Sequence, residues 1–181
     1  MDINLLVKLT SRAWSLNILA LLHAGIPGRQ APLLAATSAS RTSFAASLEH
    51  LVQLGLLERN PGHGHPLRPE FRLTRSGAVA AETAGRIVHA VPDDGEFALL
   101  RRSWTVPILA LTQRPRRFSV LKSDLATITD RALSTSLHQL EERAWLRRDI
   151  DVTKRVPHPT YRAANRGIEI NRAVALGASA R

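Results

Sequence analysis

Hydrophobic positions recur at helical spacing in two stretches of the chain that lie ninety residues apart. Within residues 12–24, Trp14, Ile18 and Leu21 fall at intervals of three and four, which predicts a helix with one apolar face against a core. The segment 104–111 carries Trp, Ile, Leu, Ala and Leu at the same positions as 14–21. The two stretches therefore predict the same element at the start of two related domains.

The correspondence continues beyond this first helix. An offset of 89 aligns four apolar positions of each half, and an offset of 90 aligns an aromatic-Arg pair and a glycine further on. The pairs are Phe44 with Leu133, Leu48 with Leu137, Leu51 with Leu140, Leu57 with Leu146, Phe71-Arg72 with Tyr161-Arg162 and Gly77 with Gly167. We interpret this agreement as a duplication, with one domain over residues 1–90 and a second over 91–181, packed about a pseudo-twofold axis.

Each copy predicts three helices, two short strands and a closing helix. In the first copy the helices are expected at 12–24, 31–36 and 41–54, the strands at 56–59 and 71–74, an irregular Gly/Pro-rich hairpin tip at 60–69 and the closing helix at 79–90. In the second copy the helices are expected at 104–112, 118–125 and 130–143 and the strands at 145–149 and 160–163. A loop is expected at 152–159 and the closing helix at 168–176. Thr37-Ser-Ala-Ser40 supplies candidate capping hydroxyls for the third helix, and Gly55 is a candidate helix stop. This order predicts a mainly α fold with small β-hairpins, of the α+β class: two tandem winged helix-turn-helix domains joined by a short linker at 91–96.

Composition favours a partner that carries negative charge. The chain has 25 Lys and Arg against 15 Asp and Glu, a formal net charge of +10, which attracts polyanions such as nucleic acid, although a basic protein without such a partner is the alternative. The absence of cysteine excludes disulfides and thiol chemistry. No apolar run reaches the roughly 18 residues that span a bilayer, and the N-terminus does not resemble a signal peptide, so we expect no membrane association and a cytoplasmic location.

The second copy carries a more specific set of residues. Trp104 begins its first helix, an Arg-Phe-Ser-x-Leu turn follows at 117–121, the third helix has the form Arg-x-Leu-Ser-x-x-Leu at 131–137, and a Pro-x-Tyr-Arg strand occupies 159–162. On these residues it resembles the HxlR-type family of bacterial transcriptional regulators. That resemblance implies a winged helix-turn-helix and binding to double-stranded DNA. Family members usually pair as homodimers, so the chain resembles such a dimer fused in tandem.

The first copy keeps only part of this set. Trp14, Leu48, Leu51, Gly55 and the strand 71–74 are present, but Gly28-Arg-Gln-Ala31 replaces the Arg-Phe-Ser turn. The N-terminal redox cysteine frequent in the family is absent as well, which excludes thiol sensing.

Side chains expected to contact DNA are those that the core does not use. Leu133, Leu137 and Leu140 face inward on the third helix of the second copy, so its outer face holds Arg131, Ser134, Thr135 and His138, with the wing adding Arg147, Arg148, Lys154, Arg155 and His158. Two guanidinium donors of Arg131 suit guanine in the major groove, whereas wing contacts to phosphate need only positive charge. The alternative is that these are ordinary solvated surface residues.

The first copy offers fewer such groups. Its candidates are Arg41, Thr42 and Ser43 on the third helix and His63 and Arg68 beside the wing. The same helix face also carries Ala45, Ala46 and Glu49, which leave little net attraction for DNA. We expect this domain to be degenerate in sequence readout.

Other chemistry finds little support in the sequence. His63-Gly-His65 lacks a third ligand for a metal, and no phosphate-binding loop, nucleophile elbow or metalloprotease motif occurs. We expect no cofactor, no metal and no enzymatic activity. The leading hypothesis is a sequence-specific transcriptional regulator that acts as a monomeric pseudo-dimer, with a small-molecule effector left open. The alternative is the same scaffold binding or converting a small molecule in the crevice between domains.

Overall fold

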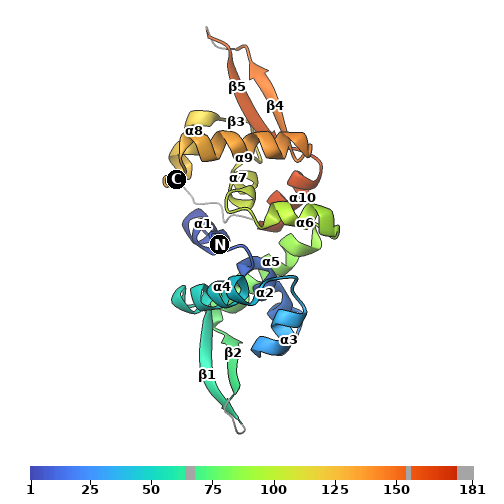
Figure 1. Cartoon of the computed structure of the whole chain (residues 1–181). Coiled ribbons are helices and arrows are strands. Elements are labelled where there is room, and N and C mark those ends of the chain that lie inside the picture. The colour runs from blue at the N-terminus through green and yellow to red at the C-terminus, as the bar shows by residue number, and fades with distance from the viewer. Residues whose placement is uncertain (64–67, 154–155, 175–181) are drawn as a thin grey trace. The chain divides into compact units, whose positions relative to one another are not determined.

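The computed structural model describes residues 1–63, 68–153 and 156–174. The chain forms two compact units, one of residues 12–89 and one that joins residues 1–11 to residues 90–181. The expected α+β class is confirmed, since most elements are helices and the sheets are small and antiparallel (Figure 1). Among the described residues no single helix is long and apolar enough to cross a membrane, although α1 (Ile3–Thr10) and α2 (Ser15–His23) together would reach that length and composition as a broken pair.

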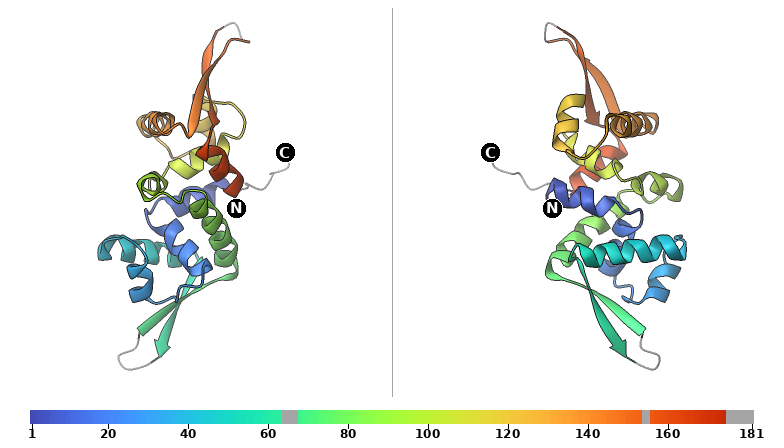
Figure 2. Two further views of the ribbon diagram at one scale, coloured as in Figure 1. Left: turned by 90° about the vertical axis from the view of Figure 1, so that its right-hand side faces the viewer. Right: turned by 60° about the vertical axis from the view of Figure 1, so that its left-hand side comes forward.

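The unit of residues 12–89 contains four helices and one hairpin in its described part. In chain order these are α2 (Ser15–His23), α3 (Gln30–Ala35), α4 (Arg41–Gln53), β1 (Leu57–His63), β2 (Arg68–Leu73) and α5 (Arg75–His89). Helix α5 packs along α2, and α4 contacts both α2 and β1. The hairpin projects away from the helices of its own unit, as both views in Figure 2 show.

The ends of α4 follow from two residues that the sequence singled out. The Ser40 hydroxyl accepts a hydrogen bond from the Ser43 backbone N–H at 3.2 Å, which satisfies one free donor of the first turn. At the other end Gly55 has φ +68°, and the Leu56 N–H donates to the Leu51 carbonyl at 3.0 Å. Phe44, Leu48 and Leu51 are buried, as expected.

The Gly/Pro-rich segment 60–69 is more regular than expected. Strand β1 continues to His63 and β2 begins at Arg68, in an antiparallel register that pairs Leu57 with Leu73 and His63 with Arg68. A register shift between Asn60 and His63 absorbs Pro61 and Gly62. The prediction of an irregular tip from residue 60 onward was therefore wrong at both ends, because a bulge allows a strand to accommodate residues that break a regular ladder.

The other unit contains six helices and three strands within its described residues. These are α1 (Ile3–Thr10), α6 (Asp94–Leu100), α7 (Thr105–Leu111), β3 (Arg116–Arg117), α8 (Phe118–Asp124), α9 (Asp130–Glu142), β4 (Leu146–Asp151), β5 (His158–Ala163) and α10 (Arg166–Val174). The sheet has the order β3-β5-β4 and is antiparallel throughout. Helix α9 lies across the base of the β4–β5 hairpin, and α10 packs on α7 (Figure 1).

Helix α1 differs from the expected domain division. Its Leu6 and Leu9 are fully buried, the helix packs against α7, and the Thr10 hydroxyl donates to the Ser103 carbonyl at 2.7 Å. Residues 1–11 therefore group with residues 90–181. Both α1 and the two-residue strand β3 were absent from the elements expected from sequence.

Equivalent close contacts occur at the start of the last helix in each unit. A Cβ on Gly77 would lie 1.8 Å from the Leu56 carbonyl oxygen, and one on Gly167 would lie 1.9 Å from the Trp145 carbonyl oxygen. Only glycine lets the helix approach the strand backbone so closely. The matching glycines at 77 and 167 thus have the same packing function in their own units.

Candidate nucleic-acid interface

The outer face of α9 presents the polar side chains that the sequence assigned to it. Leu133, Leu137 and Leu140 are buried beneath the helix, because they recur at the spacing of one helical face. Arg131, Ser134, Thr135 and His138 are exposed on the opposite side. The division of α9 into a core face and a solvent face is as predicted, and it brings these four candidates together on one helix.

The start of α9 is fixed by two contacts. The Thr129 hydroxyl accepts a hydrogen bond from the Ala132 N–H at 3.2 Å, so Thr129 caps the helix. Lys122 of α8 lies with its Nζ 2.9 Å from Oδ1 of Asp130, whose side chain is 78% exposed. This pair connects the two helices of the helix-turn-helix and partly neutralises the carboxylate at the start of α9.

His138 has an acidic neighbour on the same helix. Its Nε2 lies 3.3 Å from Oε1 of Glu142 one turn away, and both side chains are exposed. The pair becomes an ion pair only when His138 is protonated. His138 is therefore available to a partner as a hydrogen-bonding group next to a negative charge.

The β4–β5 hairpin differs from the expected free basic wing. Arg147 and Arg148 are exposed on β4, but the Arg147 Nε–H donates to Oδ2 of Asp149 at 2.9 Å. His158 is half-buried, with Nε2 3.3 Å from Oδ2 of Asp151. Of the five basic wing residues predicted, Lys154 and Arg155 lie outside the described residues.

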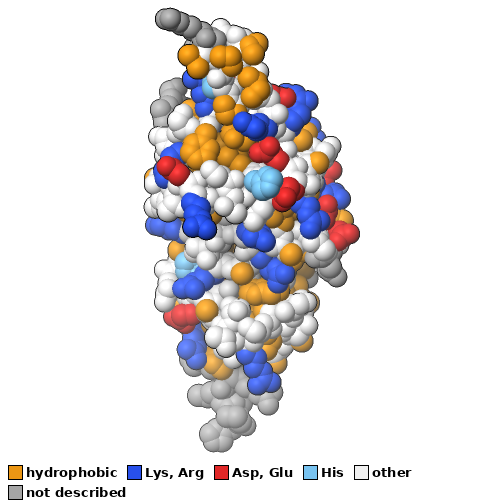
Figure 3. Space-filling view, turned by 45° about the horizontal axis from the view of Figure 1, so that its top comes forward, with side chains coloured by type: hydrophobic (Ala, Val, Ile, Leu, Met, Phe, Trp, Pro, Cys, Tyr) orange, Lys and Arg blue, Asp and Glu red, His pale blue; other side chains and the backbone are white. Residues whose placement is uncertain are grey.

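Thr153 holds the Asp151 carboxylate at the end of β4. The Thr153 hydroxyl and its backbone N–H donate to Oδ1 at 2.6 and 2.9 Å, and these bonds lower the pKa of Asp151, with a smaller contribution from His158. Beside them Ile150, Val152 and Val156 expose 54, 72 and 72% of their surface. The hairpin thus combines paired charges with apolar side chains, which Figure 3 shows gathered near its end.

The corresponding helix of the first unit is poorer in donors. Arg41, Thr42 and Ser43 are exposed on α4, together with Ala45, Ala46 and Glu49. The Ser43 hydroxyl accepts a hydrogen bond from Ser40 at 3.1 Å, so it takes part in the helix cap. His63 and Arg68 end β1 and begin β2, but their side chains lie outside the described part, as does His65.

A hollow beside α9 was missed in the sequence analysis. Arg102 and Trp104, from the turn before α7, line it together with Arg131, Thr135 and Gln139 of α9, and its volume is about 390 Å³. Trp104 is only half-buried, whereas its counterpart Trp14 is buried and Trp145 is fully buried. The turn's approach to α9 depends on tertiary packing, so no sequence pattern could have indicated this hollow.

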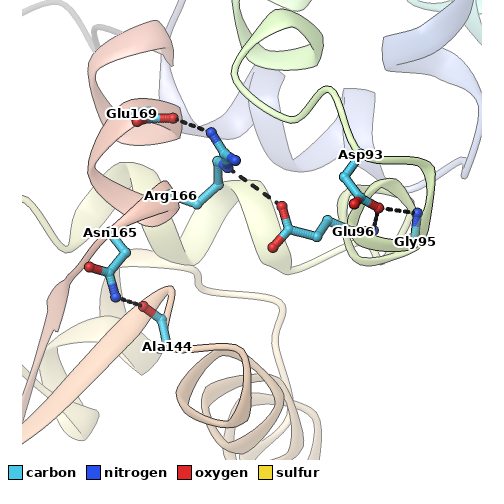
Figure 4. Close-up of polar contacts among 7 residues, drawn as sticks. All are labelled: Asp93, Gly95, Glu96, Ala144, Asn165, Arg166 and Glu169. Carbon is cyan, nitrogen blue, oxygen red and sulfur yellow. Dashed lines mark hydrogen bonds and ion pairs between the residues drawn. The ribbon is translucent and has the colours of Figure 1, made fainter.

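Ion pairs and hydrogen bonds connect α10 to α6 and to the residues that follow α9. Arg166 at the start of α10 lies 3.5 Å from Glu96 of α6 and 2.8 Å from Glu169, and the bond to Glu169 raises the pKa of Arg166 (Figure 4). Asp93 caps α6 by accepting from the Gly95 N–H at 2.7 Å. The Asn165 side chain donates to the Ala144 carbonyl at 2.9 Å, which joins α10 to the residue that ends α9.

The sequence of residues 99–176 matches a known family model. These residues match the family of HxlR-like helix-turn-helix proteins. The match covers less than half of the chain, agrees with the resemblance inferred from the sequence and suggests a DNA-binding transcriptional regulator. No curated protein and no solved structure matches the chain.

Proposed function

We propose that this protein is a sequence-specific transcriptional regulator that reads double-stranded DNA with α9 and contacts its backbone with the β4–β5 hairpin. The observation that carries this proposal is the outer face of α9, where Arg131, Thr135 and Ser134 are exposed above a buried leucine stripe. Donors on one face of a rigidly capped helix are what base readout in the major groove requires.

The rest of the chain acts as a second winged helix of weaker readout. The order of helices and strands from α2 to α5 is the same as that from α7 to α10 apart from β3. The exposed face of α4 has one arginine and one glutamate, so its electrostatic contribution is small. We propose that α4 holds the chain on DNA while α9 supplies most of the sequence preference, which makes one chain equivalent to an asymmetric dimer.

Genome-wide mapping of sites occupied by the tagged chain tests this function directly. We expect a small set of sharp sites sharing a motif, and binding in vitro to a duplex from the strongest site. Arg131→Ala should weaken binding to that duplex and relax its preference at one base pair, whereas Arg172→Ala, which removes an exposed arginine from α10, should retain both. Broad occupancy without a motif, or equal losses from both variants, contradicts sequence-specific binding through α9.

A further inference from the structure

The hollow beside α9 is lined by two arginines and by neutral side chains that can donate hydrogen bonds. Arg102, Trp104, Arg131, Thr135 and Gln139 all line it, and no carboxylate does. Across the described part of the chain, none of these five side chains has a hydrogen-bond or ion-pair partner. By contrast, Arg116, Lys122, Arg147 and Arg166 of the same unit each face a carboxylate. The hollow is therefore a concave site suited to an anion.

Its place on the helix indicates which anion. Arg131 and Thr135 belong both to the hollow and to the proposed reading face, so the hollow lies along one flank of α9. A helix with its side chains is about 10–12 Å wide and the major groove about 12 Å. A helix seated there has a phosphate backbone along each flank, and one backbone would pass the hollow.

We infer that the hollow is a binding site for the sugar-phosphate backbone at the edge of the major groove, an inference that rests on the proposed function. The Arg102 guanidinium pairs with a phosphate, and the Trp104 indole N–H donates to a phosphate oxygen while its ring packs on the deoxyribose. Residues before α7 thus extend the interface beyond the helix-turn-helix and the wing, and fix the register of α9 without reading bases.

Helix α1 helps to position this site through a hydrogen bond to the turn before α7. The Thr10 hydroxyl donates to the Ser103 carbonyl at 2.7 Å, and Thr10 is only 3% exposed. Because Ser103 lies between Arg102 and Trp104, this bond holds the turn that presents both side chains. Thr10 is therefore a positioning residue for the hollow.

The salt dependence of DNA binding by the full-length chain tests the inference. Each phosphate contact adds about 0.9 to the slope of log affinity against log salt, so Arg102→Ala should lower the slope by about one and weaken binding at 0.1 M salt about 5- to 10-fold. The loss should be the same for specific and unrelated duplexes. Arg102→Lys should keep the wild-type slope, because a phosphate contact needs only the positive charge. Trp104→Phe should weaken binding but leave the slope unchanged, because it removes no charge.

Arg172→Ala removes the same charge from α10 and serves as the matched control, while thermal unfolding of each variant checks that it is folded. A slope that stays unchanged in folded Arg102→Ala, with wild-type binding intact, overturns the backbone site and leaves the proposed function standing. The same conclusion follows if Arg172→Ala lowers the slope equally. Failure of the wild-type chain to bind any duplex overturns the proposed function and the hollow together.

Discussion

Ala144 ends α9 in a conformation that alanine rarely adopts. Its φ is +53°, and the following Trp145 N–H donates to the Leu140 carbonyl at 2.9 Å, as in a left-handed helix cap. The equivalent residue after α4 is Gly55, with φ +68°. A side chain in this region costs about 1–2 kcal/mol, which glycine avoids.

Ala144→Gly should therefore raise the free energy of unfolding by about 0.5–1 kcal/mol, after subtracting the greater entropy of glycine in the unfolded chain. Gly55→Ala should lower it by a similar amount, since a Cβ there meets nothing within 4 Å and only the backbone conformation is strained. Urea unfolding of both variants measures these changes. If Ala144→Gly instead lowers the free energy of unfolding, the methyl group of Ala144 stabilises the fold by more than its backbone strain costs.

Burial was predictable for residues within regular helices and less so at their ends. The leucines of α9 and the exposed polar residues between them follow the helical period, so the sequence was sufficient for that part of the site. The exposure of Trp104 and His158 was not predictable in this way, because it depends on how each packs against another element. Their half-buried positions follow from the α9 flank beside Trp104 and from Asp151 beside His158.

At the scale of elements, the two proposed reading helices differ in what they offer. The exposed face of α9 carries Arg131, Thr135 and His138, whereas the exposed face of α4 carries Arg41, Ala45 and Glu49. Arg131→Ala should cost about 1–3 kcal/mol of binding free energy and relax preference at one base pair. Arg41→Ala should cost less and leave the preference unchanged.

Titration of both variants against a set of single-base operator changes measures this difference. The operator should then contain one well-defined half-site and one loose half-site about 34 Å away, one turn of DNA. Equal losses from the two variants, or a symmetric operator, would contradict the asymmetry.

Elements of the chain were predictable where periodicity extended over several turns. The third helices were expected at 41–54 and 130–143 and lie at Arg41–Gln53 and Asp130–Glu142. Helix α1 was missed, and the apolar face that it buries packs on α7, which lies far along the chain from it. Strand β3 was missed because its two residues form a strand only through their pairing with Tyr161 and Thr160.

At the scale of the whole molecule, α1 belongs energetically to the unit of residues 90–181. Leu9 is fully buried in α1, which packs on α7, so Leu9→Ala should cost about 2–5 kcal/mol. Hydrogen exchange should accelerate in α7 and α10 and stay nearly unchanged in α2 and α5. Val79→Ala, at a site on α5 that is 59% exposed, is the control and should change neither the stability nor the rates of hydrogen exchange. Faster exchange confined to α2 and α5 would contradict this grouping.

The net charge of +10 should make DNA binding strongly dependent on salt. With four to six phosphate contacts, affinity should fall about 10²–10³-fold between 50 and 200 mM salt. Mobility shifts on the promoter nearest the chain's own gene, at several salt concentrations, measure this slope. A slope near zero, with binding retained, would show that contacts other than phosphate pairs dominate.

The discontinuous unit has a consequence for synthesis on the ribosome. Residues 12–89 are contiguous and can fold as soon as they emerge, but 93 positions separate Thr10 from its partner Ser103. At about 5–20 residues per second, α1 waits for about 5–20 seconds with its apolar face in water. Helix α1 can thus pack only after α7 has been made, and a nascent chain stalled before α7 leaves Leu6 and Leu9 without the helix they pack against.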